Sequence, residues 1–344
     1  MADPVPVKFF GACRHVLQYT PMNVPDTAEK IKKMEIRGAG RIARAAVSAL
    51  AVHSAACPEE DFDRYRDEME RAAALLIATR PTAVSLPNAV HQVMRPLRGG
   101  AGPVTTAKEQ FSEACEAFIS ASEGAVKQIG NVGARHIRDG DVVLTHCNSE
   151  AALGCLLEAH ANGTRFSVFA TEVRPGNQGL LTIQTLNDAG IATNYIVDSA
   201  VRYFMKEVDL VIVGADAVSV NGAVVNKIGT SQIALAAHEA RTNFLVAAET
   251  YKFAPRTILG EFIAIEERDS TELLDRETAR LLPHVTPRNP VFDVTPAEYV
   301  DLILTEAGAI PPQMAYIIIR DYLGWDIREF QQVTGRDDER PPGC

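Results

Sequence analysis

The sequence contains few cysteines, and they follow no pattern typical of a metal site or a disulfide framework. Six cysteines are spread over 344 residues, without a CxxC pair or the spacing of zinc ligands. The opening residues, MADPVPVKFF, lack the charged and then apolar segments of a secretory signal. We therefore expect reduced thiols and a location in the cytoplasm.

Long apolar runs and an excess of positive charge are also absent. No apolar stretch approaches the ~20 residues of a membrane-spanning helix, so no membrane contact is predicted. The formal net charge of −10 argues against binding of nucleic acid through a basic surface. It leaves room for an anionic small molecule, because a few local arginines and lysines can outweigh the global charge. The eight histidines show no i,i+4 pairs around acids, so neither a metal site nor a cofactor is expected.

The first part of the chain has a helical pattern. Apolar residues at 47% and charged residues at 23% are typical of a globular protein, and the length allows two domains. Helical spacing of apolar residues covers three ranges: 27–53, 61–78 and 107–129. Gly38 and Gly40 interrupt the first of them. Residues 98–106, RGGAGPVTT, are interpreted as a flexible link rather than a phosphate loop, because they follow a helix and not a strand.

From Gly140 onward, short apolar strands alternate with helices. Strands are predicted at 141–146, 165–170, 193–197, 209–213 and 243–248. Helices are predicted at about 149–161, 179–189, 199–206 and 230–241. Such alternation indicates an α/β fold with a parallel sheet covered by helices on both faces, and residues 299–322 are expected to continue it. The segment after Asp216, AVSVNGAVVNKIGT, predicts a hairpin with its turn at Asn221-Gly222.

Reactive side chains follow these predicted strands. The carboxyl ends of parallel strands meet at one edge of a sheet, where ligands bind. Cys147 lies between the first strand and a helix, where the positive helix end can favour a thiolate. A free cysteine is nevertheless often only a small buried side chain. Asp216 follows an apolar run with no helix to cap, and burial there favours the protonated form, a possible proton donor.

Other acids follow the remaining strands, and their roles stay open. Asp198 and Ser199 are interpreted as ordinary helix caps. Glu172 and Glu249 are either solvated loop carboxylates or partners of the site residues.

Cationic side chains and free amides give the same edge an anion-binding character. The candidate cations are Arg37, Arg80, Arg174, Lys227 and Lys252. Glycines beside such residues let an anion reach backbone N–H donors. The turn at residues 149–151, directly after Cys147, offers further amides of a helix start. A substrate with one or two phosphates would suit these groups.

Several ordered motifs closely resemble archaeal ribose-1,5-bisphosphate isomerase. They are EIRGAGRIAR, TRPTAVSLPNAV, THCNSEAAL, TEVRP, GADAVSVNGAVVNKIGT, AAETYKF and NPVFDVTPAEYVDLILTE. Together they span nearly the whole chain. The wider superfamily also contains methylthioribose-1-phosphate isomerase and regulatory subunits of a eukaryotic initiation-factor exchange complex.

The resemblance implies a mainly helical N-terminal domain, here 1–135, joined to a Rossmann-like catalytic domain, here 136–335. Residues 336–344 are predicted to be a disordered tail. It also implies conversion of α-D-ribose 1,5-bisphosphate to D-ribulose 1,5-bisphosphate, within archaeal AMP and nucleoside degradation that feeds ribulose-bisphosphate carboxylase. Relatives imply a homo-oligomer, either a dimer or a dimer-based hexamer.

The family motifs carry functional residues over to this chain. Cys147 is implied as the proton acceptor and Asp216 as the proton donor. Substrate contacts are implied for Arg37, Gly38, Ala39, Gly40, Arg80, Ser149, Glu150, Ala151, Asn226, Lys227 and Lys252. Related archaeal sequences often have HCHS and then a basic residue, where this chain has Asn148 and Glu150. Glu150 would have to use its backbone N–H, because its carboxylate repels phosphate.

The expected chemistry explains the choice of a thiol and an acid. Phosphate on the anomeric oxygen blocks ordinary ring opening, so we expect Cys147 to accept the C2 proton while Asp216 protonates the ring oxygen. This role requires a lowered pKa for the thiol and a raised pKa for the carboxyl group. Two alternatives remain. A methylthioribose-1-phosphate isomerase would hold a methylthio group in place of the second phosphate, although RGAG rather than RGAP favours the bisphosphate branch. A noncatalytic regulatory protein would not need both Cys147 and Asp216.

Overall fold

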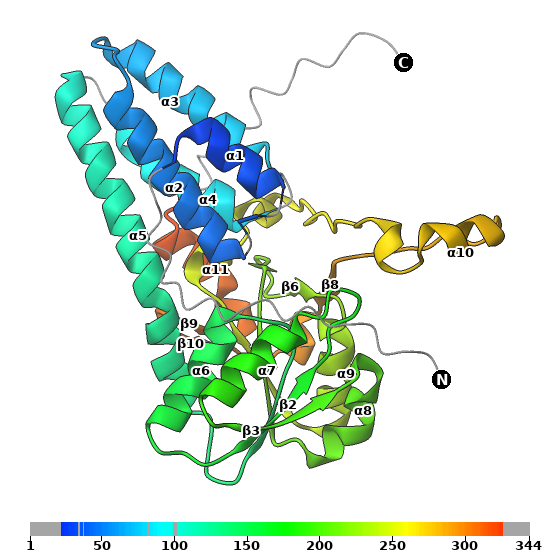
Figure 1. Cartoon of the computed structure of the whole chain (residues 1–344). Helices are drawn as coiled ribbons and strands as arrows, with labels where there is room; N and C mark the ends of the chain where they lie inside the picture. The colour runs from blue at the N-terminus through cyan, green and yellow to red at the C-terminus, as the bar shows by residue number, and fades with distance from the viewer. Residues whose placement is uncertain (1–21, 34, 37, 81–82, 99–101, 326–344) are drawn as a thin grey trace.

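The structure is a computed structural model that describes residues 22–33, 35–36, 38–80, 83–98 and 102–325. Arg37, part of the predicted link at 98–106 and the predicted tail at 336–344 lie outside these residues. The first part of the chain is a set of packed helices (Figure 1). They are α1 (Val24–Lys32), α2 (Ala39–Ala56), α3 (Phe62–Ile77), α4 (Ser85–Met94) and α5 (Val104–Ala134).

Local signals account for most of these helices. The side chains of Asn23 and Asp61 cap the first turns of α1 and α3. The helical pattern at 27–53, which Gly38 and Gly40 interrupt, corresponds to two helices, and Gly38, with a φ of +87°, directly precedes α2. Helix α4 was not predicted. It is only ten residues long and has Pro87 in its first turn, a residue that is typical of a break in a helix.

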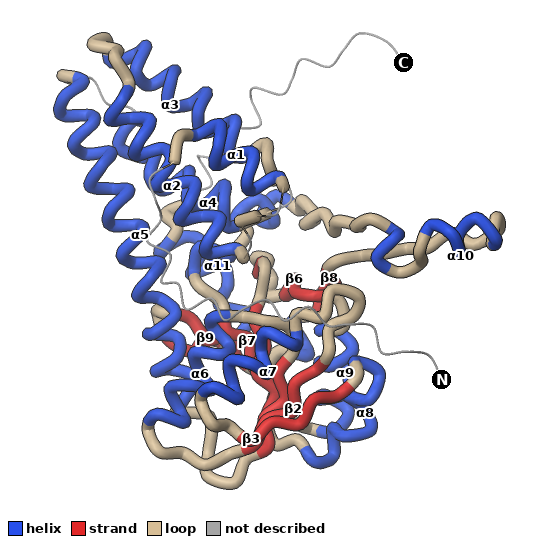
Figure 2. The backbone as a smooth tube through the Cα atoms, in the orientation of Figure 1, coloured by secondary structure: helices blue, strands red, loops and turns tan. Residues whose placement is uncertain are grey.

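A seven-stranded sheet forms the centre of the second part (Figure 2). Its strands are β1 (Val142–Thr145), β2 (Ser167–Thr171), β3 (Ala192–Ile196), β4 (Leu210–Gly214), β7 (Asn243–Ala247), β9 (Leu302–Thr305) and β10 (Gly308–Ile310). Their order is β10-β9-β7-β4-β1-β2-β3, and the pairs are parallel except β10 with β9. The five predicted strands and the α/β class are confirmed. Strand order reverses between β1 and β4, as in a Rossmann-like sheet.

Helices cover both faces of this sheet (Figure 1). They are α6 (Glu150–Ala161), α7 (Gly179–Asp188), α8 (Val201–Phe204) and α9 (Thr230–Ala240). Alternate residues of β4 show the two faces: Leu210 and Ile212 pack with α6 and α7, whereas Val211 and Val213 pack with α8 and α9. The helix predicted at 199–206 is a series of short helical turns.

The hydrophobic core continues from the α8–α9 face of the sheet into the N-terminal helices without a break. Helix α5 contacts both α2 and α6, and it also contacts β9. The predicted domain boundary at residue 135 coincides with the end of α5. The division into two domains stays a prediction.

The predicted hairpin is confirmed, and the last unit of the sheet differs from its prediction. Strands β5 (Ala217–Val218) and β6 (Val224–Lys227) pair antiparallel around Gly222, and β8 (Phe292–Thr295) completes a small second sheet. After β9 the chain turns back at Gly308, with a φ of +126°, into antiparallel β10. The predicted parallel strand is therefore present as β9, which pairs with β7, whereas the helix expected after it is replaced by β10 and the short helical turns α11 (Ala315–Ile317) and Ile318–Tyr322.

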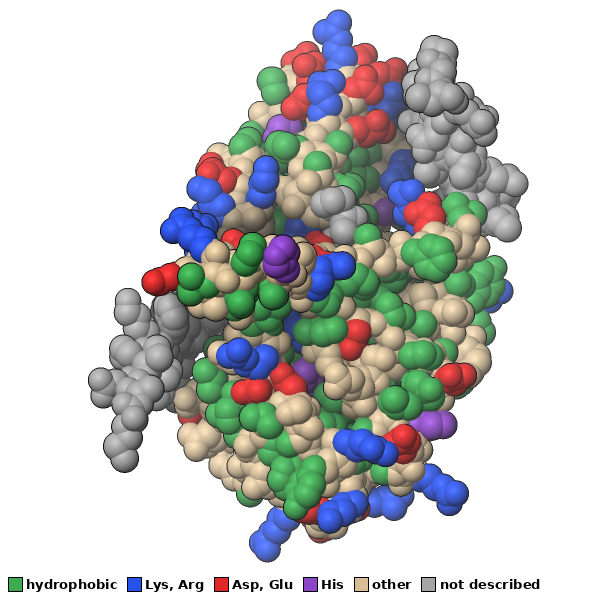
Figure 3. All heavy atoms as spheres, turned by 90° about the vertical axis from the view of Figure 1, so that its right-hand side faces the viewer, with side chains coloured by type: hydrophobic (Ala, Val, Ile, Leu, Met, Phe, Trp, Pro, Cys, Tyr) green, Lys and Arg blue, Asp and Glu red, His purple; other side chains and the backbone are tan. Residues whose placement is uncertain are grey.

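Residues 260–290, called the arm below, project from the body and carry α10 (Arg276–Leu281) (Figure 1). Most arm residues are exposed, including Phe262, whose exposed fraction is 99%. Figure 3 views the arm from its tip and shows hydrophobic side chains on its surface. In the described part of the chain, no helix is both long and apolar enough to cross a membrane.

Candidate active site

A cavity of about 320 Å³ lies between the N-terminal helices and the carboxyl ends of β1, β4 and β7. The predicted site residues that line it are Gly38, Ala39, Gly40, Arg80, Cys147, Ser149, Glu150, Asp216, Asn226, Lys227 and Lys252. Ala151 packs its side chain into the core beneath α6, so only its backbone remains for a ligand. Of the candidates that the sequence analysis added, Glu249 lines the cavity, whereas Arg174, Glu172 and Asp198 do not.

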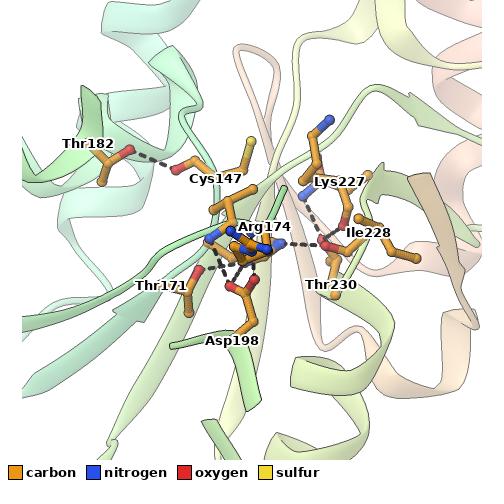
Figure 4. A network of polar contacts seen from close by, with 12 residues as sticks. Cys147, Thr171, Arg174, Thr182, Asp198, Lys227, Ile228 and Thr230 are labelled. Atoms are coloured by element: carbon orange, nitrogen blue, oxygen red, sulfur yellow. Dashed lines mark hydrogen bonds and ion pairs between the residues drawn. The ribbon is translucent and has the colours of Figure 1, made fainter. Parts of the chain in front are cut away.

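Cys147 occupies a tight connection between β1 and α6. Its φ is +66°, and its carbonyl oxygen accepts a hydrogen bond of 2.8 Å from Thr182 Oγ1. Ser149 then caps α6 by accepting from the backbone N–H of Ala152. In Figure 4 the Cys147 sulfur and the Lys227 side chain both point toward the top of the view, away from Asp198.

The expected lowering of the Cys147 pKa is wrong for this structure. Burial raises the pKa of the thiol to about 11, although Lys227 and the backbone N–H of Asn148 oppose the shift. The thiol precedes α6 by three positions, and desolvation outweighs the field of the helix end. Lys227 itself has a pKa lowered by burial.

Asp216 meets the expectation for a buried acid. Its backbone N–H donates to the carbonyl oxygen of Val225 in β6, so the residue is fixed between β4 and β5. Burial raises the pKa of its carboxyl group, whereas Lys252, Lys227 and Arg80 oppose this rise. Such a rise favours the protonated form of the carboxyl group, which a proton donor needs.

Cations reach the cavity from three directions. Lys252 follows β7, and its Nζ lies 2.6 Å from Glu249 Oε2. Lys227 comes from the end of β6, with its Nζ 5.0 Å from the centre of the Phe292 ring. Arg80 follows α3 and lies 3.2 Å from Glu266 in the arm. These charges and the amides at the start of α6 can hold an anionic ligand over Cys147 and Asp216.

The Glu150 carboxylate is held by two arginines of α2. Its oxygens lie 3.0 Å from Arg41 Nε and 4.0 Å from Arg44 NH2. These contacts reduce its repulsion of an anion, while the backbone N–H of Glu150 remains in the first turn of α6. The geometry fits the expected backbone contact.

His146 ties the strand that precedes Cys147 to the loop that follows Lys227. Its Nδ1 lies 2.6 Å from Thr171 Oγ1, and its Nε2 lies 2.9 Å from the carbonyl oxygen of Ile228. Burial lowers the pKa of His146, so its ring is neutral; Nε2 donates to Ile228 and Nδ1 accepts from Thr171. Gly229 leaves room for this ring, because an added Cβ would lie 3.1 Å from it.

The expectation that Asp198 and Ser199 are helix caps is wrong, because both lie inside the helical turn Asp198–Ala200, which follows Val197 and has no side-chain cap. The Asp198 carboxylate accepts hydrogen bonds from the backbone N–H groups of Val173 (2.9 Å) and Arg174 (2.8 Å). It therefore fixes the loop between β2 and α7, as Figure 4 shows beside Arg174. The side chain of Arg174 is not part of the cavity wall.

Several cavity residues were missed by sequence reasoning. They include Gln178, Leu181, Ile263, Arg268 and Phe292. None directly follows a strand of the large sheet, and two of them belong to the arm. No pattern in the sequence predicts that these residues lie at the cavity. Within the described residues, no group of three or more His, Cys, Asp or Glu side chains is arranged to hold a metal ion.

The arrangement of a buried acid, a thiol and anion-binding groups suits proton transfer on an anionic substrate. The sequence matches the model of the Initiation factor 2 subunit family over residues 35–312, and the chain belongs to this family. A protein of Methanocaldococcus jannaschii named ribose 1,5-bisphosphate isomerase is 52% identical over 302 residues, covering 88% of this chain and 96% of that protein. One of the same name from Archaeoglobus fulgidus is 51% identical over 311 residues, covering 90% and 97%.

Other members of the family are similar to a lower degree. A methylthioribose-1-phosphate isomerase of Acetivibrio thermocellus is 37% identical, covering 84% of this chain and 89% of that protein. The solved structure of a Pyrococcus horikoshii translation initiation factor eIF-2B has a TM-score of 0.72 at 32% identity, covering 84% of this chain and 97% of that chain. The higher identity to the curated isomerases places this protein among the enzymes of the family, as an isomerase.

Proposed function

We propose that the protein converts α-D-ribose 1,5-bisphosphate to D-ribulose 1,5-bisphosphate. One observation carries this proposal: Cys147 and Asp216 line the same cavity, at the ends of the two strands where the sheet order reverses. A thiol and a protonated carboxyl group supply a proton acceptor and a proton donor. Arg80, Lys227 and Lys252 supply positive charge for two phosphate groups.

The mechanism begins with ring opening that does not need a free anomeric hydroxyl. Cys147, as the thiolate, removes the C2 proton, and the electron pair forms a C1–C2 double bond as the bond from C1 to the ring oxygen breaks. Asp216 gives its proton to that oxygen. The Cys147 thiol then protonates C1, while the C2 hydroxyl returns a proton to the Asp216 carboxylate and becomes the ketone.

The surroundings of the two groups act differently on these roles. Burial opposes the thiolate form of Cys147 and raises its pKa to about 11, whereas the Lys227 charge favours the thiolate. Burial raises the pKa of Asp216, which favours the protonated form that a proton donor requires.

The metabolic setting and the assembly are further parts of this proposal. The reaction fits archaeal AMP and nucleoside degradation, with ribulose-bisphosphate carboxylase consuming the product in the cytoplasm. A homo-oligomer, as a dimer or dimer-based hexamer, is supported by apolar side chains on the arm, since Phe262, Leu281 and Val285 are 99%, 77% and 53% exposed. Light scattering of the purified chain would measure its oligomeric state.

The function is tested by turnover of ribose 1,5-bisphosphate, followed through a coupled carboxylase assay. The wild type should form ribulose 1,5-bisphosphate, and Cys147→Ser and Asp216→Asn should each abolish turnover while substrate still binds. Methylthioribose 1-phosphate, assayed side by side, distinguishes the related activity. Near-normal kcat in Cys147→Ser would remove the thiol from the mechanism, and turnover of the methylthio sugar alone would replace the proposed substrate.

A further inference from the structure

Glu249 is a buried carboxylate in the cavity wall to which the proposed mechanism gives no role. It follows β7 directly, and its Oε2 lies 2.6 Å from Lys252 Nζ; the two side chains are only 4% and 8% exposed. Its Oε1 accepts a hydrogen bond of 3.1 Å from the Tyr251 hydroxyl. Both carboxylate oxygens are therefore held in place.

The short turn that carries Glu249 and Lys252 is fixed from two sides. Asn88 of α4 donates from Nδ2 to the carbonyl oxygens of Tyr251 (2.9 Å) and Phe253 (2.6 Å). On the other side, Glu306 after β9 accepts from the backbone N–H of Thr250 at 3.1 Å. The positions of the two charges in the cavity wall are thus set by the N-terminal helices and the sheet together.

Glu249 is also connected to the cavity wall formed by α2. The Tyr251 hydroxyl, which donates to Glu249, accepts a hydrogen bond of 3.3 Å from Ser122, and Ser122 accepts one of 3.1 Å from Arg44. A Cβ at Gly40 would lie 2.8 Å from the Tyr251 hydroxyl oxygen. Only glycine at this position lets the segment approach the network so closely.

The contact between Glu249 and Lys252 affects the charge balance around Asp216. Lys252, Lys227 and Arg80 line the same cavity as Asp216 and favour its carboxylate form, with Lys252 contributing the largest effect of the three. Glu249 acts in the opposite direction, and the Cys147 thiol also interacts electrostatically with Asp216. Burial opposes the charge on Lys252, but Glu249 and then Asp216 raise the pKa of its ammonium group.

We propose that Glu249 is a positioning residue that fixes the Lys252 ammonium in the cavity and offsets its charge at Asp216, so that the Asp216 carboxyl group keeps the proton it donates. This role deepens the proposed isomerase function and rests on it. Without the Glu249 charge, the positive charge of Lys252 would lower the pKa of Asp216. The Asp216 carboxyl group would then lose its proton at a lower pH and could no longer act as the donor there.

The test compares Glu249→Gln, which keeps the size and the hydrogen-bonding oxygen, with the wild type. In the wild type, kcat should fall at alkaline pH as Asp216 loses its proton, and in Glu249→Gln this fall should occur about one pH unit lower. At pH values above the fall, kcat of the variant should be roughly tenfold below that of the wild type. KM should stay unchanged or decrease, because Lys252 remains available to phosphate. Glu249→Asp, which keeps the charge, should restore the position of the alkaline fall.

Three further variants separate this role from a purely structural one. Tyr251→Phe removes a hydrogen bond from Glu249 but no charge, so the alkaline fall should not move. Glu239→Gln is a matched change in the exposed Arg202–Glu239 ion pair and should leave kcat and KM unchanged. Lys252→Met should move the titration of Asp216 in the opposite direction, to higher pH, and it tests the proposal should Glu249→Gln fail to fold.

A second readout needs no turnover. The infrared band of the protonated Asp216 carboxyl, identified by its loss in Asp216→Asn, should disappear at lower pH in Glu249→Gln than in the wild type. Titrations that coincide in the wild type, Glu249→Gln and Lys252→Met would overturn the proposal. A wild type that shows these shifts but does not convert ribose 1,5-bisphosphate would contradict the proposed substrate and leave the role of Glu249 standing.

Discussion

The Cys147 thiol should hold its proton far more firmly in the free protein than an ordinary cysteine does. Burial raises its pKa from 9.0 to about 11, and Lys227 is the largest effect that opposes this rise. A rise of two units lowers the thiolate fraction at neutral pH by about 100-fold. Replacement of Lys227 by methionine removes the opposing charge, so the pKa of Cys147 should rise further in Lys227→Met.

Alkylation by iodoacetamide measures this property, because only the thiolate reacts. The modified Cys147 peptide is quantified by mass spectrometry, with Cys147→Ser as the background control. Between about pH 7 and about pH 10 the wild-type rate should rise about tenfold per pH unit without a plateau. Lys227→Met should react more slowly at every pH. A plateau at or below the ordinary pKa of a cysteine would refute the argument that desolvation dominates at this site.

Two further predictions concern stability. Gly214→Ala should lower the free energy of unfolding by about 1–3 kcal/mol, because the added Cβ would lie 2.3 Å from Ser149 Oγ. Urea denaturation measures this change. Equal stability would contradict the prediction and show that Ser149 can move aside at no cost. Burial raises the pKa of Asp293 from 3.8 to about 6, so its contribution to stability is present below pH 3.8 and is lost as the pH rises through 6. Asp293→Asn should therefore flatten the dependence of Tm on pH between these values and raise Tm at neutral pH. Its amide oxygen can still accept from Gly229 and Ser231, and an unchanged Tm profile would count against the assigned titration.

The strands and the residues that follow them were predictable because each rests on a local pattern. Buried parallel strands appear as short apolar runs, and their ends meet at one edge, which brought Cys147 and Asp216 to one cavity. Helix α4 was missed because it is short and has Pro87 in its first turn. The arm, which brings Arg268 to the cavity, has no apolar periodicity that predicts its position beside the cavity.

Electrostatic properties depended on the tertiary structure to different degrees. The raised pKa of Asp216 was predictable, because an acid after a buried strand is desolvated wherever the rest of the chain lies. The pKa of Cys147 was not, because the competition between the helix end and burial depends on how deeply the loop packs. The Glu249–Lys252 pair has a spacing of three residues that sequence could indicate, but its burial beneath α4 could not be seen there.

The most direct test of this mechanism is a crystal structure of Asp216→Asn with ribose 1,5-bisphosphate bound. We expect Cys147 Sγ within about 3.5 Å of C2 and the amide introduced at position 216 at hydrogen-bonding distance from the ring oxygen. The two phosphates should lie against the start of α6 and the cavity lysines. A bound sugar whose C2 and ring oxygen lie beyond reach of these two side chains would contradict the mechanism.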